Sequence, residues 1–449
     1  MKCKSLFLGI LCLLFLGGLR AQDKKSYSLK EAQDYALQNS PTAKQSTLSV
    51  DQSRKRVNEI TAIGLPQVAG SLGYQNFIKQ PVQLIPSEFV NPNAEPGTFE
   101  EVVFGTKQNA SVDLTVNQLI FDGSYIVGLQ AARTYVLLAQ NQDEKSQIDV
   151  MQMVREAYHT VLVAEENLEV LKKSKTSITK LVSETQALYD NGFAEEQDVD
   201  QLKLTESRIN NNIRNAERQV GIAKNLLKYQ MGLDLKIEID LSDDINSLLS
   251  VPQGEDFLNK DFNAANHIDY KIVGTSVKLN ELALKNERAK YLPSLGGYFN
   301  WQENSFSNDN TFVGDGAQWF PTRVWGLQLN VPIFTSFQRR SIVAQAQIDL
   351  EKSQLQLNQV EQGLQLQVQT ARSNYAMAVE TYRTEKSNME LAEKIYNRTR
   401  TKYKEGLATS FELTQSENQW LESQGSYINS MLQLLNAKSE LDQALNDFN

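Results

Sequence analysis

Apolar and polar residues alternate along four short segments of the chain, two in each half. In residues 67–75, Val68 and Leu72 fall on one face and polar side chains on the other, and Trp325 and Leu327 repeat the pattern in the second half. Because the side chains of a strand point alternately to its two faces, a period of two predicts strands with one apolar face. We therefore expect strands at about 66–76, 109–121, 293–303 and 321–334.

Between these strands the apolar spacing is that of helices, and two long stretches contain no proline. All ten prolines lie outside residues 97–251 and 333–449. Because proline removes a backbone donor and clashes with the preceding turn, its absence permits very long helices. A helix of about 65 residues would be roughly 100 Å long. We expect helices at 41–63, 123–188 and 195–231 in the first half and at 266–290, 336–403 and 409–447 in the second.

Residues 336–403 carry a heptad pattern of apolar and tyrosine residues. Two runs with a spacing of seven residues are joined by one step of four, between Ala371 and Tyr375. Heptads impose a left-handed supercoil, and a four-residue step unwinds it locally. We expect these side chains to pack between helices, while faces rich in Gln, Asn, Ser and Lys meet water. The runs are Val343, Leu350, Leu357, Leu364 and Ala371, then Tyr375, Tyr382, Met389, Tyr396 and Tyr403.

Self-similarity along the chain indicates a tandem duplication. Three pairs of short segments match in the same order and with similar spacing, which chance explains poorly. The pairs are 64–68 with 291–295, 114–121 with 327–334, and 189–194 with 403–408. We interpret residues 22–235 as a first repeat, 236–265 as a connector and 266–449 as a second repeat.

The predicted sheet has two interpretations. One is an ordinary sandwich whose apolar face covers a core. The other is a membrane barrel, which is favoured by the tryptophans of the second sheet region (Trp301, Trp319 and Trp325) and by long polar loops at 77–108 and 304–320. Aromatic residues at the membrane interface and long outer loops are typical of such barrels. Four strands cannot close a barrel, so other copies of the chain must complete it.

The first 21 residues have the features of a secretory signal peptide. Lys2 and Lys4 form a basic start, residues 6–16 an apolar run, and Ala21 precedes the expected cleavage point. Both cysteines lie in this segment, so the mature chain would contain no disulfide. The net charge of the whole chain is −9, which makes nucleic acid a poor partner.

Enzymatic chemistry has no support in the sequence. The two histidines, His159 and His267, have no acidic partners at metal spacing, and we expect both to be structural. No nucleophile elbow or phosphate-binding loop is present. We therefore expect no catalytic residues, no metal and no cofactor.

The chain resembles the TolC family of bacterial outer-membrane efflux proteins. The resemblance rests on the duplicated half, on the strand end at 330–334 and on the paired turns around Gly192 and Gly406. It implies a homotrimer in the outer membrane of a Gram-negative bacterium, in which four strands per chain form one lipid-embedded β-barrel. The helices would form a coiled-coil barrel in the periplasm.

The same resemblance assigns roles to residues near the two helical turns. Gly192, Phe193, Gly406 and Leu407 match the turns on which a periplasmic adaptor, also called a membrane fusion protein, docks. A periplasmic gate is implied at Asp198, Tyr403, Glu412 and Gln415, where Gln415 is an amide in place of an acid. Ala408 replaces a basic residue that assists this gate. The alternative is that Asp198 and Glu412 only stabilise helix N-termini, which favour negative charge.

Three functions share parts of this pattern. The first is a passive exit duct for small molecules, supplied by an inner-membrane pump through the adaptor. The second is an outer-membrane duct for type I protein secretion, which has every feature described. The third is a periplasmic coiled-coil scaffold or adaptor protein, which the duplicated strand pair with clustered tryptophans opposes.

Overall fold

The computed structural model describes residues 25–249, 261–309, 311–313 and 316–446, so the predicted signal peptide lies outside the described residues. The chain divides into two compact units. A sheet unit contains residues 50–138 and 274–356, and a helical unit contains the residues up to 49, 139–273 and those from 357 onward. Each unit draws on both halves of the sequence.

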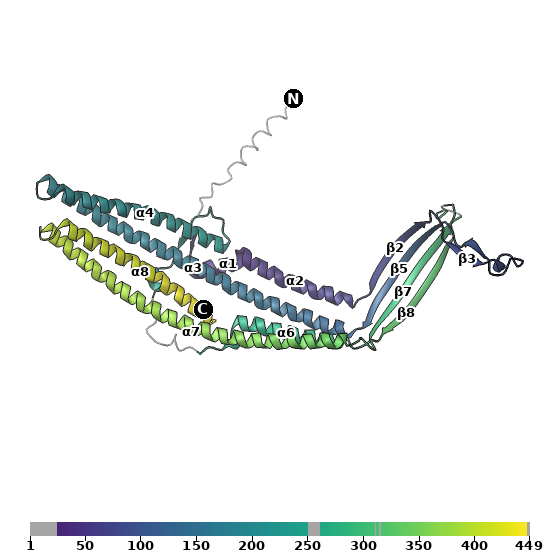
Figure 1. The fold of residues 1–449 in the computed structure, drawn as a ribbon. Coiled ribbons are helices and arrows are strands. Elements are labelled where there is room, and N and C mark those ends of the chain that lie inside the picture. The colour runs from purple at the N-terminus through teal and green to yellow at the C-terminus, as the bar shows by residue number, and fades with distance from the viewer. Residues whose placement is uncertain (1–24, 250–260, 310, 314–315, 447–449) are drawn as a thin grey trace, which may run out of the picture. The chain divides into compact units, whose positions relative to one another are not determined.

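The sheet unit is built around one antiparallel sheet of four strands. They lie side by side in the order β2, β5, β7, β8 (Figure 1), which leaves β2 and β8 as edges. Each edge strand presents unpaired backbone donors and acceptors to any neighbouring chain. The strands are β2 (Gln67–Asn76), β5 (Gln108–Phe121), β7 (Ser294–Ser307) and β8 (Trp319–Asn330).

The register confirms the predicted alternation of faces. Val68 pairs with Val116, Val116 with Phe299, and Phe299 with Trp325, so an apolar row crosses the whole sheet. The neighbouring row, Gln67 with Asn117 and Asn117 with Tyr298, lies on the opposite face. One face of the sheet is therefore mainly apolar and the other mainly polar.

Residues 77–108 are more structured than the polar loop expected there. They contain the hairpin of β3 (Val82–Pro86) and β4 (Phe99–Val103), with the short helix η1 (Ser87–Phe89) between the strands. Strands of five residues, with prolines nearby, are too short for a period of two to stand out. The other expected loop, 304–320, is shorter than predicted because β7 and β8 extend into it.

Besides the sheet strands, the described residues contain six long helices, three in each repeat. The chain of α3 turns back into α4, and that of α7 turns back into α8 (Figure 1). None of the helices in the described residues is long and apolar enough to cross a membrane. The helices are α2 (Pro41–Ile63), α3 (Gly123–Asp190), α4 (Glu196–Met231), α6 (Ile268–Ala289), α7 (Gln338–Lys404) and α8 (Ser410–Ala444).

Several short elements of the helical unit have no counterpart in the sequence prediction. β1 pairs in parallel with β6, and the Tyr158 hydroxyl donates to the Tyr27 carbonyl at 2.9 Å. The strand pair joins the N-terminal segment to the connector between repeats, and the hydrogen bond joins it to α3. The elements are β1 (Lys25–Tyr27), α1 (Leu29–Asn39), β6 (Ile239–Leu241), α5 (Ile245–Leu248) and the short helix η3 (Ala264–Asn266).

The heptad residues of α7 are packed as predicted. In the helical unit Leu364 and Ala371 are buried before the four-residue step, and Tyr375, Tyr382 and Tyr396 after it. Tyr396 stacks on Trp420 of α8 with ring centroids 4.9 Å apart and an interplanar angle of 8°. The pattern thus identifies the side chains that hold α7 against its neighbours.

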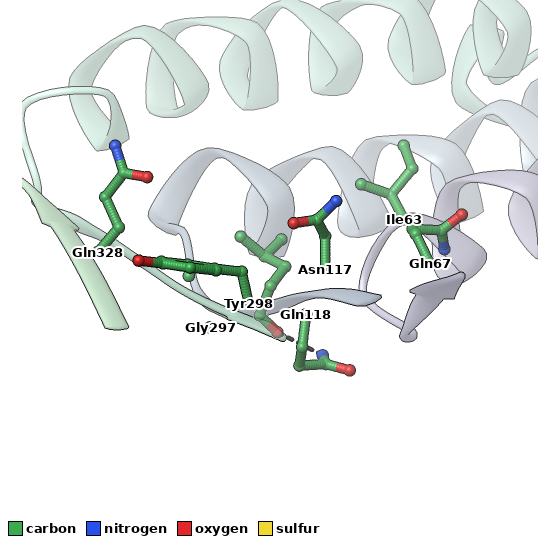
Figure 2. Close-up of a pocket in the computed structure, with 9 residues that line it drawn as sticks. Ile63, Gln67, Asn117, Gln118, Gly297, Tyr298 and Gln328 are labelled. Atoms are coloured by element: carbon green, nitrogen blue, oxygen red, sulfur yellow. Dashed lines mark hydrogen bonds between the residues drawn. The ribbon is translucent and has the colours of Figure 1, made fainter. Parts of the chain in front are cut away.

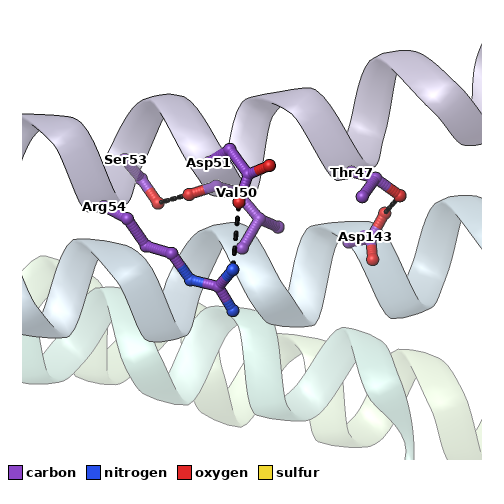
Figure 3. Close-up of polar contacts among 6 residues, drawn as sticks. All are labelled: Thr47, Val50, Asp51, Ser53, Arg54 and Asp143. Atoms are coloured by element: carbon purple, nitrogen blue, oxygen red, sulfur yellow. Dashed lines mark hydrogen bonds and ion pairs between the residues drawn. The ribbon is translucent and has the colours of Figure 1, made fainter.

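Polar contacts add to this packing within the helical unit. Thr47 of α2 contacts Asp143 of α3 at 3.4 Å (Figure 3), and Arg155 of α3 pairs with Asp442 of α8 at 3.2 Å. The second pair is largely buried, so the loss of either partner would leave an unpaired charge. Figure 3 also shows the exposed pair of Arg54 with Asp51, a kind of contact that stabilises little.

Candidate functional site

The two helical turns predicted as docking sites share one geometry. Gly192 has φ 77° and Gly406 has φ 71°, a left-handed conformation that glycine adopts without strain. The Phe193 amide donates to the Leu188 carbonyl at 2.8 Å. In the second repeat the Leu407 amide donates to the Lys402 carbonyl, also at 2.8 Å. Such bonds satisfy carbonyls at the end of a helix, so both long helices stop in the same way.

These turns present large apolar side chains to solvent. Phe193 is 81% exposed, Leu407 72% and Phe411 68%. Three such side chains near two neighbouring turns form a candidate contact surface, since buried aromatic and aliphatic anchors dominate binding at interfaces. We call Phe193, Leu407 and Phe411 the tip residues.

Each turn is followed by a helix that begins with a capping box. The Glu195 amide donates to Asp198 at 3.2 Å at the start of α4, and the Thr409 amide donates to Glu412 at 2.8 Å at the start of α8. Hydrogen bonds from Thr409 lower the pKa of the Glu412 carboxyl. The helix-stabilising function considered for Asp198 and Glu412 is therefore present in the structure.

A pocket of about 600 Å³ lies between the two turns. It brings together five of the predicted residues, while Leu407, Glu412 and Gln415 are not among its lining residues. Burial, with the nearby Asp198 charge, raises the pKa of the Tyr403 phenol. Tyr403 and Asp198 thus share one pocket within a single chain. The five residues are Gly192, Phe193, Asp198, Tyr403 and Gly406.

Contacts between α3 and α7 join the two helices that lead to these turns, and the sequence did not reveal them. The Lys404 ammonium pairs with Glu184 at 2.5 Å, and Arg400 donates to the Ser177 hydroxyl at 3.0 Å. Ala408 leaves the turn without the basic residue implied there, but Lys404 places a cation one turn earlier. The pairing partners lie in different repeats, so no local spacing pattern could have indicated them.

A buried carboxyl lies further along α8. Glu417 is 1% exposed, and its Oε2 has no hydrogen-bond partner among the described residues. Burial raises the pKa of this carboxyl to about 7. Its charge in turn contributes to a raised pKa of Tyr396, which places the two side chains near each other. An isolated buried carboxyl favours its neutral form because the charged form is poorly solvated.

The sheet unit has its own pocket of about 550 Å³, drawn in Figure 2. Asn117 and Gln118 point to opposite sides of their strand, and Gln118 Nε2 donates to the Gly64 carbonyl at 2.8 Å. No lining residue is charged. The lining includes Ile63, Gln67, Asn117, Gln118, Tyr298 and Gln328.

The three tryptophans predicted at the membrane interface lie on the apolar face at different heights. Trp319 begins β8 and pairs with Ser305, and its indole donates to the Phe312 carbonyl at 3.2 Å. Trp301 and Trp325 lie in the middle of β7 and β8. Trp319 is thus at the loop end of the sheet, where an interface residue would be expected.

The two histidines are surrounded by structural contacts. His159 is buried, and burial together with Arg155 and Lys438 lowers its pKa to about 3. His267 lies 3.7 Å from Asp269, whose amide donates to the imidazole. In the part of the chain that the structure describes, no group of three or more His, Cys, Asp or Glu could hold a metal ion.

Sequence comparison matches the chain to one protein family. The model described as outer membrane efflux protein matches residues 33–233 and 279–447, one region in each repeat. No curated protein matches the sequence.

Solved outer-membrane channels share the fold. CusC matches with a TM-score of 0.71 and 15% identity, covering 94% of this chain and 92% of that chain. CmeC of Campylobacter jejuni matches with a TM-score of 0.68 and 15% identity, covering 96% of this chain and 91% of that chain. VceC of Vibrio cholerae matches with a TM-score of 0.68 and 14% identity, covering 93% of this chain and 95% of that chain.

Proposed function

Because the chain belongs to the outer membrane efflux protein family, we propose that it is the exit duct of a tripartite efflux system in a Gram-negative bacterium. Three copies form one channel, with the sheet in outer-membrane lipid and the helices in the periplasm. An inner-membrane pump supplies the energy, and a periplasmic adaptor joins the pump to the channel. Small molecules then leave passively through the channel.

The sheet supports this proposal most directly. Its apolar face suits lipid, its polar face suits a wet interior, and its two edges are unpaired. The strands alternate in direction, so β8 of one copy can pair antiparallel with β2 of the next. Twelve strands from three copies lie within the range of membrane barrels, whereas four do not.

The turns support docking of an adaptor. The exposed tip residues are apolar, and both turns repeat the same backbone geometry. In a trimer these would give six similar sites in a ring, which a repeating adaptor assembly could contact. A duct for protein secretion would use the same surfaces, and the pump and adaptor would decide between the two cargoes.

Glu412 provides a test of the gate. Three copies of this carboxyl near a threefold axis would favour cations. Glu412→Gln keeps a side chain that can close the capping box, so the helix start is preserved. We expect the variant to show reduced cation preference, measured as the reversal potential of single channels in a planar bilayer under a KCl gradient.

Glu31→Gln is the matched control for this experiment. Glu31 closes the same capping box with Ser28 at the start of α1, away from the turns. The control should leave the reversal potential unchanged. Equal reversal potentials for Glu412→Gln and the parent would restrict Glu412 to helix capping.

A further inference from the structure

The polar face of the sheet carries almost no charge. The strands β2, β5, β7 and β8 contain three charged residues, Asp113, Glu303 and Arg323. Glu303 pairs with Val112, and Arg323 pairs with Trp301, so both lie on the apolar face. Asp113 is the only charged residue of these four strands on the polar face.

The neighbours of Asp113 on this face are neutral. The register places Ser71 beside it on one side and Gln302 on the other, followed by Thr322. No ion pair joins Asp113 to a cation within the described residues. No cation in this described part of the chain therefore compensates its negative charge.

The next rows toward the helices are also neutral. Asn300 donates to the Thr115 hydroxyl at 3.0 Å, and Asn117 and Tyr298 follow in register. The pocket of Figure 2 lies here, and its lining contains amides and a phenol but no charge. Amides and hydroxyls can both donate and accept hydrogen bonds, so this surface can hydrate or bind neutral polar solutes.

We propose that Asp113 is a charge-selective position of the channel, set in an otherwise neutral barrel interior that passes cationic and neutral polar solutes in preference to anions. This inference rests on the proposed function, because three copies of the polar face must line one lumen. Threefold symmetry then places three Asp113 carboxylates at one height. Rings of acidic side chains favour cations in many channels.

The test compares Asp113→Asn with Glu303→Gln. The two acids occupy adjacent rows of the same sheet but opposite faces, so each substitution removes one charge per chain at nearly the same height. Both variants and the parent are purified and placed in planar bilayers. The ratio of K⁺ to Cl⁻ permeability is measured from reversal potentials at about 0.1 M salt, where charges act over about 10 Å.

Asp113→Asn should lower the permeability ratio by about twofold or more, and Glu303→Gln should leave it within error of the parent. The difference should shrink at about 1 M salt, where screening is stronger. An unchanged ratio in Asp113→Asn overturns the inference. A change confined to Glu303→Gln overturns it as well, because the two faces would then be exchanged.

Two readouts separate this inference from the proposed function. If the parent forms discrete channels but Asp113→Asn does not alter selectivity, only the inference fails. If the parent itself forms no channel, the proposed function fails. Asp113→Lys provides a second variant, which should shift the preference toward anions beyond the effect of Asp113→Asn.

Discussion

At the scale of single residues, Glu417 is an acidic side chain that is almost fully buried in the helical unit. It lies among the buried residues around Tyr396 and Trp420, where ionisation would be poorly solvated. The Glu417 carboxyl interacts electrostatically with the Tyr396 phenol of α7, and Arg400 interacts with the same phenol. The neutral acid is thus the form that suits the packed helices.

Glu417 predicts a pH dependence of stability. Its carboxyl has an ordinary pKa of 4.5, which burial raises to about 7 in the folded chain. The unfolded chain loses this proton first, so the free energy of unfolding should fall as pH rises from about 4.5 to 7, by about 3 kcal/mol. Glu417→Gln should remove this part of the pH dependence in thermal melts between pH 5 and 8.

The surface variant Glu422→Gln is the control for this prediction, because Glu422 is exposed on the same helix. The stability of Glu422→Gln should vary with pH in the same way as that of the parent. Parallel pH profiles for Glu417→Gln and the parent would show that the Glu417 carboxyl is solvated in the folded protein.

Residue roles were only partly predictable from the sequence. The glycines of the two turns could be identified because a left-handed residue favours glycine, and the structure gives both a positive φ. Glu417 could not be identified, because its burial depends on Tyr396, which lies in a different helix. The capping role of Glu412 follows from its position near a helix start, whereas the gate role depends on other copies of the chain.

At the scale of elements, the ends of the long helices are set by glycine. Gly232 follows α4 with φ 73° and packs against the segment that joins α1 to α2. A Cβ at this position would lie 2.7 Å from the Asn39 carbonyl oxygen and 3.0 Å from the Ser40 Cα. Both conformation and space therefore require glycine here.

Gly232→Ala should destabilise the protein. The left-handed conformation alone costs roughly 1–2 kcal/mol, and the backbone contacts add to this. Gly221→Ala in the same helix is the matched comparison, since nothing lies within 4 Å of its added Cβ and alanine favours helix. Thermal melting should show a lower midpoint for the first variant and an equal or higher midpoint for the second. Equal midpoints for both would contradict the proposed role of Gly232.

Element prediction succeeded where a pattern was long. The heptads of α7 and the alternation in β5, β7 and β8 extend over many residues, and the structure buries or pairs them as expected. The hairpin of β3 and β4 and the pair of β1 and β6 are only three to five residues per strand. The position of such a short strand is set by its pairing with another strand. A local sequence pattern carries no information on that partner.

At the scale of the whole molecule, the two edge strands of the sheet require partner strands from other copies of the chain. An exposed edge strand with free backbone groups is avoided in stable proteins unless another strand pairs with it. Here β2 and β8 are the edges of the sheet, and no further strand pairs with either among the residues that the structure describes. Pairing β8 of one copy with β2 of the next satisfies both edges when three copies close a ring.

Disulfide cross-linking between neighbouring chains tests this closure most directly. The mature chain is expected to contain no cysteine, so Ala69→Cys in β2 can be combined with cysteine at Thr322 or Val324 of β8 without background. Oxidation in isolated outer membranes should yield cross-linked dimers and trimers for at least one pair, and nothing larger. Single-cysteine variants should give no trimer. Monomers alone for every pair, or an open ladder of larger species, would contradict a barrel closed by three copies.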